Sequence, residues 1–391
     1  SHVISPINTR FSSCEESTTM PFSYSIFPFV LLLLAVTLAV AEEQEDEKLA
    51  NAIVDWIRKE GGYFSSSLKI GRLHDDPLNP LGLFASQDIE PHESLLIVPH
   101  STFISLWDEA AEDEDDDDSD EVYVQNVCRL AQKLDVELKL GNDSYYKPFV
   151  EYIQNQKQGQ IPATWSEEGK QALGQVLPED SDVIDWTKRH FADCNVDETV
   201  LALTVQRGYD TALIPVWDLV NHRNGNALNT ENDPMYSNDA LKVRASKNIR
   251  KGEEIFATYN ECVDCRETSW YWGTPEILRD FGFVEGFPQR WIYLNQDPEI
   301  LFEIDQNDDG ELEVEWDIEE DGYGVPDDEG IAFLQSELKR LQELHFSERG
   351  SVPQHEWNTI IQYHNACITA ISEAVKSAVE YHQEEEDTDE L

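Results

Sequence analysis

The sequence predicts an α+β fold in which two strand-rich segments enclose a helical stretch. Short apolar runs bounded by turn residues predict strands at 68–70, 82–85, 94–99, 241–245 and 254–259. Helical periodicity dominates between the third and fourth of these strands, and again near the C-terminus. The 391 residues include 10 Trp, 14 Tyr and 16 Phe, enough apolar material for two domains.

The other predicted elements follow in chain order. An amphipathic helix at 51–59 precedes the first strands, and Gly61 and Gly62 end it. After the third strand we expect helices at 122–138, 148–153, 166–173, 182–191 and 198–209, then a strand at 212–216. Near the C-terminus an acidic hairpin-like stretch leads to two helices, at 331–344 and 356–381. Each has an apolar stripe at helical spacing.

These patterns divide the chain into six parts. In order, they are a signal peptide (20–41), a first strand-rich part (50–106), an acidic loop with a helical insert (107–200), a second strand-rich part (201–291), a small C-terminal helical subdomain (292–383) and an acidic tail (384–391). The acidic runs in these parts are typical of solvated segments.

The region near the N-terminus predicts entry into the secretory pathway. An uncharged lead from Met20 is followed by the apolar run 27–41, which closes on Ala-Val-Ala, a small-x-small cleavage pattern. An uncleaved membrane anchor is the alternative, although the run is short for a transmembrane span. Residues 388–391, Thr-Asp-Glu-Leu, are similar to the signal that retains proteins in the endoplasmic reticulum. We therefore expect the lumen of the endoplasmic reticulum as the location, with no stable membrane association after cleavage.

The charge of the chain restricts its partners. The formal net charge is −51 at pH 7, from 28 Lys and Arg against 79 Asp and Glu. Such a surface repels phosphates, so the composition argues against nucleic acid as a partner. It attracts a basic partner instead, such as a lysine-bearing segment of another protein.

Cysteine usage and acidic motifs predict no resident metal. Five cysteines follow the predicted signal peptide, and an odd number cannot pair completely. Cys262 and Cys265 would fill only half of a tetrahedral zinc site, so a local disulfide or a structural role is favoured. The stretch 305–310 is similar to the first half of a calcium loop, but Trp316 stands where the loop needs its final glutamate. Residues 142–144, Asn-Asp-Ser, form a glycosylation sequon that is usable only in the lumen.

Three motifs occur in a fixed order. The first is Leu-Gly-Leu-Phe-Ala at 81–85. The second is Pro-Val-Trp-Asp-Leu-Val-Asn-His at 215–222, preceded by Arg207. The third is Lys-Gly-Glu-Glu-Ile-Phe-Ala-Thr-Tyr-Asn at 251–260, followed by Asp-Phe-Gly-Phe-Val-Glu at 280–285. Each motif alone has a structural explanation as a bulge, a capped turn or a strand entry.

Together, and with Pro-Ala-Thr-Trp-Ser-Glu-Glu at 162–168, these motifs resemble the SET-domain protein methyltransferases. The nearest branch is similar to the Rubisco and actin-histidine methyltransferases, whose SET domain is split by a helical insert. The resemblance extends over residues 61–291. It implies a β-rich SET fold, in which the parts at 50–106 and 201–291 are the two portions of the SET domain and the second holds the cofactor and catalytic motifs.

The resemblance also implies a cofactor and a set of site residues. The cofactor would be S-adenosyl-L-methionine. Asn221 and His222 would hold its amino-acid and adenine portions, and Arg207 would pair with its carboxylate. The backbone of Leu81, Gly82 and Leu83 would line the same pocket. Tyr259 would be the active-site tyrosine, beside the cofactor.

The chemistry of methyl transfer explains these residue types. Transfer from a sulfonium is an in-line displacement, so the positioning of the reactants dominates the rate. A lysine acceptor must first lose its proton, which a narrow aromatic channel favours by desolvation. The Tyr259 hydroxyl can then orient the amine. A methyltransferase acting on protein lysine is therefore the predicted function.

Two departures from the family pattern keep alternatives open. Phe281 stands where the family often has a second tyrosine, and Asn79-Pro80 replaces Glu-Gly before the first motif. The residues after His222 look more like the actin-histidine branch, so a histidine acceptor is the alternative within the enzyme class. The alternative from another class is a non-catalytic, acidic lumenal protein that keeps the SET scaffold for partner or calcium binding.

Overall fold

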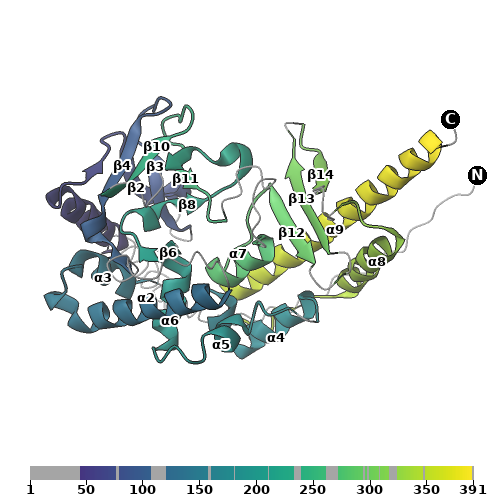
Figure 1. Cartoon of the computed structure of the whole chain (residues 1–391), viewed down its shortest axis with the longest axis horizontal. Coiled ribbons are helices and arrows are strands. Elements are labelled where there is room, and N and C mark those ends of the chain that lie inside the picture. The colour runs from purple at the N-terminus through teal and green to yellow at the C-terminus, as the bar shows by residue number, and fades with distance from the viewer. Residues whose placement is uncertain are drawn as a thin grey trace, which may run out of the picture. The chain divides into compact units, whose positions relative to one another are not determined.

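The chain is described here by a computed structural model (Figure 1). The structure describes residues 45–75, 79–106, 120–156, 160–179, 181–209, 211–232, 239–260, 272–293, 296, 299–307, 309–316, 324–346 and 348–389. All of them belong to one compact unit, Gln44–Leu391. The predicted signal peptide, the pair Cys262 and Cys265, and most of the acidic loop lie outside the described residues.

Strands of the two strand-rich parts mix in small sheets. A four-stranded antiparallel sheet has the order β1-β4-β10-β9, so strands from both parts lie side by side in it. Its strands are β1 (Tyr63–Phe64), β4 (Ser94–Pro99), β10 (Ala240–Ala245) and β9 (Thr230–Asn232). Two further pairings are β2 (Leu68–Arg72) with β3 (Leu81–Ala85), and β5 (Ile104–Ser105) with β7 (Ala212–Leu213) and β6 (Gly208–Tyr209).

One apolar core joins these sheets. It contains Leu83, Leu95 and Val98 from the first part and Leu241, Val243 and Ile255 from the second, all essentially inaccessible to solvent. The helix at 45–59 covers it with Ile53 and Ile57. Since residues far apart in the chain fill one core, neither strand-rich part buries its apolar face alone.

Helices occupy the segment between the two strand-rich parts. They are α2 (Asp120–Leu140), α3 (Lys147–Gln154), α4 (Glu167–Val176), α5 (Trp186–His190) and α6 (Glu198–Arg207). α2 and α6 pack side by side (Figure 1). α3 contributes Phe149 and Ile153 to the core of the sheets. A disulfide between Cys128 and Cys194 joins α2 to the segment before α6.

The C-terminal region contains a sheet as well as helices. β12 (Gln289–Tyr293), β13 (Ile300–Gln306) and β14 (Leu312–Trp316) form an antiparallel sheet in that order. α8 (Asp328–Glu343) and α9 (Gln354–Asp389) pack on one another, and α9 also contacts β13 and β14. α7 (Thr274–Phe281) joins this core through Leu278.

The C-terminal helices hold α4 at both of its ends. Ser166, the N-cap of α4, donates its hydroxyl to the buried carboxylate of Glu356 on α9 over 2.6 Å. At the other end of α4, the guanidinium of Arg340 on α8 donates to the carbonyl oxygens of Gln175 and Val176. The Arg340 bonds satisfy carbonyl groups that a helix leaves unpaired at its C-terminal end, and Glu356 also accepts the backbone N–H of Ser166 over 3.0 Å. α4 therefore packs as part of the C-terminal region.

The structure confirms most predicted elements and changes several boundaries. The acidic turn between β13 and β14 and the two C-terminal helices lie where the sequence predicts them. The first helix begins by Glu45 rather than at 51, and the helix predicted at 198–209 ends at Arg207. The strand predicted at 212–216 stops at Leu213, because the chain turns sharply at Val216, where φ is +67°. None of the described helices is both long enough and apolar enough to cross a membrane.

Candidate active site

The three motifs meet at the edge of the first core. β8 (Asn221–His222) and β11 (Phe256–Ala257) pair in parallel, with Asn221 opposite Phe256. The segment before β11 lies beside β3, because the Ile255 amide donates to the Leu83 carbonyl oxygen over 2.8 Å. The first motif therefore contacts the third, which pairs with the second.

Asn221 connects the motifs through its side-chain amide. The Nδ2 atom donates to the Leu81 carbonyl oxygen over 3.3 Å and to Oε1 of Glu254 over 2.6 Å. The carboxamide oxygen of Asn221 remains as an acceptor. Burial raises the pKa of Glu254, although the Asn221 hydrogen bond and the charge of Arg223 oppose that shift.

Glycine is required at position 82 by this contact. A Cβ atom there would lie 2.5 Å from Oε1 of Glu254 and 2.7 Å from Nδ2 of Asn221. Such distances are not tolerated, so a larger residue would push Asn221 and Glu254 away from β3. Leu81, Gly82 and Leu83 therefore lie against Asn221 and the third motif.

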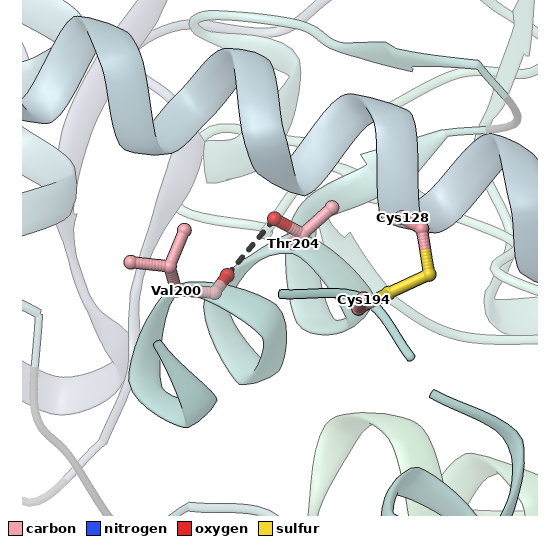
Figure 2. The surroundings of a disulfide bond; sticks show 4 residues. All are labelled: Cys128, Cys194, Val200 and Thr204. Atoms are coloured by element: carbon pink, nitrogen blue, oxygen red, sulfur yellow. Dashed lines mark hydrogen bonds between the residues drawn. A yellow bond between two sulfur atoms is a disulfide. The ribbon is translucent and has the colours of Figure 1, made fainter. Parts of the chain in front are cut away.

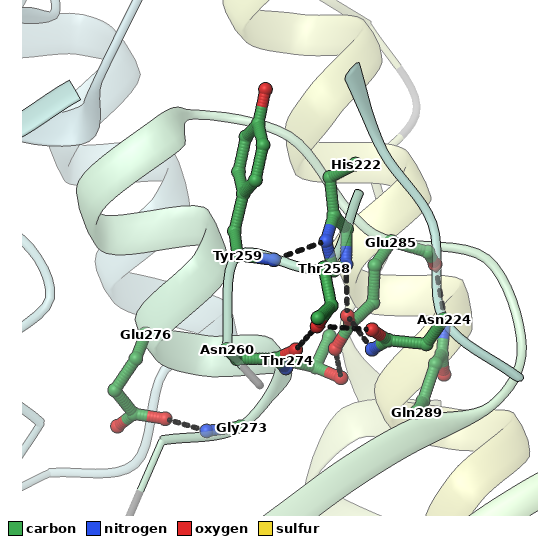
Figure 3. A network of polar contacts seen from close by, with 10 residues as sticks. All are labelled: His222, Asn224, Thr258, Tyr259, Asn260, Gly273, Thr274, Glu276, Glu285 and Gln289. Atoms are coloured by element: carbon green, nitrogen blue, oxygen red, sulfur yellow. Dashed lines mark hydrogen bonds and ion pairs between the residues drawn. The ribbon is translucent and has the colours of Figure 1, made fainter. Parts of the chain in front are cut away.

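His222 is the centre of a buried polar network (Figure 3). Its Nδ1 atom accepts the backbone N–H of Tyr259 over 3.0 Å, so the proton of the neutral ring resides on Nε2. Nε2 donates to Oε2 of Glu285 over 2.9 Å, and both side chains are 1% exposed. Glu285 also accepts from Asn224 and Thr274. Both ring nitrogens are engaged, so His222 can contact a cofactor only through backbone atoms or the face of its ring.

Tyr259 extends away from this network (Figure 3) and is enclosed by aromatic rings. Its hydroxyl donates to the carbonyl oxygen of Val220 over 2.9 Å. Its ring centroid lies 4.6 Å from that of Phe281, 5.1 Å from that of His222 and 6.4 Å from that of Phe283. Burial, reinforced by the negative charge of Asp218, raises the pKa of Tyr259, so its hydroxyl stays protonated.

Arg207 forms a buried ion pair with Asp218. Its Nη1 atom lies 2.6 Å from both carboxylate oxygens, and the two side chains are 10% and 6% exposed. Its Nη2 atom donates to Gln156 over 3.0 Å, and its Nε atom is buried without a partner among the described residues. Burial lowers the pKa of the Arg207 guanidinium, but Asp218 together with Tyr152 and Tyr259 outweighs this effect, so the pKa is raised. Both charges act on the Tyr259 hydroxyl, so the pair borders the site.

A strained turn brings Asp218 to Arg207. Val216 is buried and has φ +67° and ψ −41°, a conformation that costs a β-branched residue about 1–3 kcal/mol. The turn reverses the chain, since the Leu219 amide donates to the Val216 carbonyl oxygen over 3.0 Å. The following residues then enter β8.

Four other residues of the site lie within the three motifs, or in the segment 280–285 that follows them, but are not among the predicted site residues. Glu285 holds His222, Glu254 holds Asn221, Asp218 neutralises Arg207, and Phe283 lies beside Tyr259. A carboxylate inside an apolar motif, such as Asp218 in its Val-Trp-Asp-Leu-Val run, is a signal that could have identified one of them. Among the described residues, no group of three or more His, Cys, Asp or Glu is arranged to hold a metal ion.

The segment that contains the three motifs matches a known family model. Residues 81–260 match the family model described as the SET domain. Residues 81–260 form a SET domain. The match covers all seven site residues predicted from the motifs, from Leu81 to Tyr259. No curated protein sequence matches the chain significantly.

Solved structures share the fold of this SET domain and of most of the chain. One is the SET domain of LSMT bound to lysine and AdoHcy, with 15% sequence identity and a TM-score of 0.50. Another is Rubisco LSMT bound to sinefungin and monomethyllysine, with 15% identity and a TM-score of 0.52. Each alignment covers 88% of this chain and 93% of the other. The predicted α+β fold of SET type, resembling the Rubisco methyltransferase branch, is therefore confirmed.

Proposed function

We propose that this chain is a protein methyltransferase that transfers a methyl group from S-adenosyl-L-methionine to a lysine side chain. The observation that carries the proposal is the position of Tyr259. Its protonated hydroxyl is held by the carbonyl oxygen of Val220, directly before Asn221, and aromatic rings surround it. The neighbouring LSMT structures, which hold lysine and AdoHcy or monomethyllysine and sinefungin, support the same reaction class.

The residues near Tyr259 provide hydrogen-bonding groups that match the amino-acid end of the cofactor. The buried Nε–H of Arg207 has no partner among the described residues and suits a carboxylate, and the carboxamide oxygen of Asn221 suits an ammonium group. The backbone of Leu81, Gly82 and Leu83 borders Asn221. When bound, the cofactor would supply an electrophilic methyl group on sulfur. Because Asp218 already neutralises Arg207, this residue would act as a hydrogen-bond donor more than as a net positive charge.

Tyr259 would orient the acceptor amine. Its O–H donates to Val220, so the phenol oxygen retains lone pairs that can accept an N–H of a neutral lysine amine. That bond would direct the nitrogen lone pair away from Tyr259 and toward the methyl group. The raised pKa of Tyr259 argues against a phenolate that acts as a strong base. Alignment of the amine is thus the contribution expected of this residue.

The aromatic enclosure would favour the uncharged amine. Phe281 and Phe283 present only apolar atoms around Tyr259. An ammonium group loses hydration there without gaining a counter-charge, so its pKa falls and the neutral form becomes accessible. Phe281, where the family often has tyrosine, therefore keeps the desolvating wall and removes one hydrogen-bonding group.

A flexible, basic segment of another protein is the proposed substrate. The net charge of −51 attracts such a segment, and an extended lysine reaches a narrow site better than a short histidine. The non-catalytic alternative loses support, because Asn221 and Tyr259 lie in one site, with Tyr259 bonded to the residue before Asn221.

The test combines cofactor binding with methyl transfer. Calorimetric titration of the chain from Glu42 onward with S-adenosyl-L-methionine should show micromolar binding that Asn221→Ala removes and Asn358→Ala, at an exposed asparagine, retains. Tyr259→Phe should bind the cofactor normally but transfer methyl to basic peptides about 100-fold more slowly. Peptides carrying one lysine or one histidine distinguish the two acceptors. A folded wild type that binds no cofactor would favour the non-catalytic alternative.

A further inference from the structure

Asn142 lies in the only Asn-x-Ser or Asn-x-Thr sequence of the chain. It is the middle residue of the short 3-10 turn Gly141–Asp143, which joins α2 to α3. Gly141 has φ +51° and no atoms near its Cβ position, so the turn projects from the surface. The side chain of Asn142 is exposed. A substituent on its amide nitrogen would therefore displace no packed group.

Three exposed apolar side chains lie close to Asn142 in the sequence. Val136 and Leu140 lie on one face of α2 at a spacing of four residues and are 55% and 47% exposed. Tyr145 follows the turn and is 51% exposed. Isolated apolar residues on a surface need no explanation, but three so near a sequon in the sequence are of the type that contacts the apolar face of a sugar ring.

Helix α2 also contains one cysteine of a disulfide, a bond typical of an oxidising compartment. Cys128 of α2 forms a disulfide with Cys194, 66 residues further along the chain (Figure 2). The bond lies in an apolar cluster with Val127, Ala131 and Phe191, so it is part of the packing between α2 and the segment before α6. Stable disulfides form in the secretory pathway and are rare in the cytosol. The sequon is usable in that same pathway.

We propose that Asn142 is a site of N-linked glycosylation, added as the chain enters the secretory pathway. In this step the Nδ2 atom of Asn142 forms a bond to the anomeric carbon of the first sugar of an oligosaccharide carried on a lipid diphosphate. The bond from that carbon to the phosphate oxygen breaks. The lipid diphosphate leaves with the electron pair, and Nδ2 loses one proton.

Ser144 indicates when the transfer occurs. In the folded chain its hydroxyl donates to Oε2 of Glu137 over 2.6 Å and accepts the amide of Tyr146, and Ser144 is 7% exposed. A hydroxyl engaged in this way is not accessible to an enzyme that reads the sequon. The sugar is therefore attached before α2 and α3 close on the turn, while the chain is still entering the lumen.

The experiment expresses the chain in a eukaryotic secretory cell, with residues 1–41 retained and no other leader. Intact mass is compared before and after treatment with peptide N-glycosidase, which converts a glycosylated Asn142 to Asp. We expect a mass loss for the wild type and for Ser144→Thr, which keeps the sequon. We expect none for Asn142→Gln, whose exposed side chain leaves the fold unchanged.

A second mass measurement, on non-reduced peptides, reports the bond between Cys128 and Cys194. An intact disulfide together with an unmodified Asn142 would overturn the glycosylation site, although the chain had reached an oxidising compartment. A reduced chain without sugar would overturn both the site and the proposed entry into the secretory pathway. Neither outcome depends on methyltransferase activity, since the two mass measurements report only the sugar on Asn142 and the disulfide.

Discussion

The carboxylate of Glu285 is the most connected polar group of the site. It accepts hydrogen bonds from His222, Asn224 and Thr274, and its side chain is 1% exposed. The bond to His222 keeps the proton on Nε2 and leaves Nδ1 free to accept the amide of Tyr259. The position of the Tyr259 backbone therefore depends on a residue that does not touch it.

Substitutions of Glu285 should separate its shape from its charge. In Glu285→Gln the amide oxygen can still accept from His222 and Asn224, while the new NH₂ group donates to the Thr274 hydroxyl. We expect a loss of about 1 kcal/mol in the free energy of unfolding and nearly normal cofactor binding. Glu285→Ala leaves buried donors unpaired and should lose about 3 kcal/mol, with weaker cofactor binding and slower transfer.

Chemical denaturation and calorimetry measure these differences. Glu348→Gln and Glu348→Ala, at an exposed glutamate, provide the matched controls. If Glu285→Ala folded as stably as the wild type and bound cofactor equally well, His222 would not need its partner, and the network would be irrelevant to the site.

At the scale of elements, α7 carries a pH-sensitive carboxyl group. Glu276 accepts the amide of Gly273 at the start of the helix. Burial raises its pKa to about 7, against the opposing effects of Arg279 and the Gly273 amide. The folded state therefore binds more protons than the unfolded state between about pH 4.5 and 7, and the contribution of Glu276 to stability falls as pH rises through that window.

Glu276→Gln should remove this pH dependence. Relative to the wild type, the variant should gain about 1–3 kcal/mol in the free energy of unfolding between pH 5 and pH 8. Denaturation of both proteins at the two pH values measures the change, and Glu348→Gln corrects for the loss of one surface charge. If the free energies of unfolding of the wild type and the variant differed by the same amount at both pH values, Glu276 would be ionised in the folded protein already at pH 5.

The helices of the insert pack against different parts of the molecule. α3 belongs to the core of the sheets, while α4 belongs to the C-terminal core and is held by Arg340 and Glu356. α6 ends at Arg207, beside the site. The C-terminal core also contacts α6 directly, because α7 packs against it.

At the scale of the whole molecule, charge should govern substrate capture. A net charge of −51 raises the local concentration of a basic peptide, and salt screens this attraction over about 8 Å at physiological ionic strength. We expect kcat/KM for a lysine-rich peptide to fall about 10-fold between 0.05 and 0.5 M salt, with kcat unchanged. A peptide with one lysine and no net charge should show little change. Equal salt effects on both peptides would contradict electrostatic capture.

The motifs could be assigned from the sequence because their residue types and their order together resemble one family. Gly82 is needed where Asn221 and Glu254 approach the backbone, and Asn221 and Tyr259 are needed for polar contacts that few other residues can make. The apolar stripe of α8 was predicted from spacing. Ile331, Leu334 and Leu341 recur at helical spacing and are buried. That stripe is visible within one segment, whereas the motifs had to be compared across three.

Other features depend on contacts between distant segments. The sequence predicts an apolar stripe on α9, and the buried residues also include Tyr363, Cys367 and Ala370, because α9 is covered by α4, α8 and the C-terminal sheet together. The pairing of Cys128 with Cys194, rather than with another cysteine, follows from the packing of α2 on the segment before α6. Glu285 and Asp218 are ordinary acidic residues until the fold buries them beside His222 and Arg207.

The sequence by itself therefore determined the α+β class, the order of the elements and the SET motifs, because spacing and residue type are properties of the chain. Only the tertiary structure decided which carboxylates hold the site residues and which nitrogens of His222 are engaged. It also decided that Tyr259 donates to Val220. The physical reason is that burial and hydrogen-bond direction arise only when strands and turns separated by 60 to 140 residues, such as Leu81 and Asn221, come within contact distance.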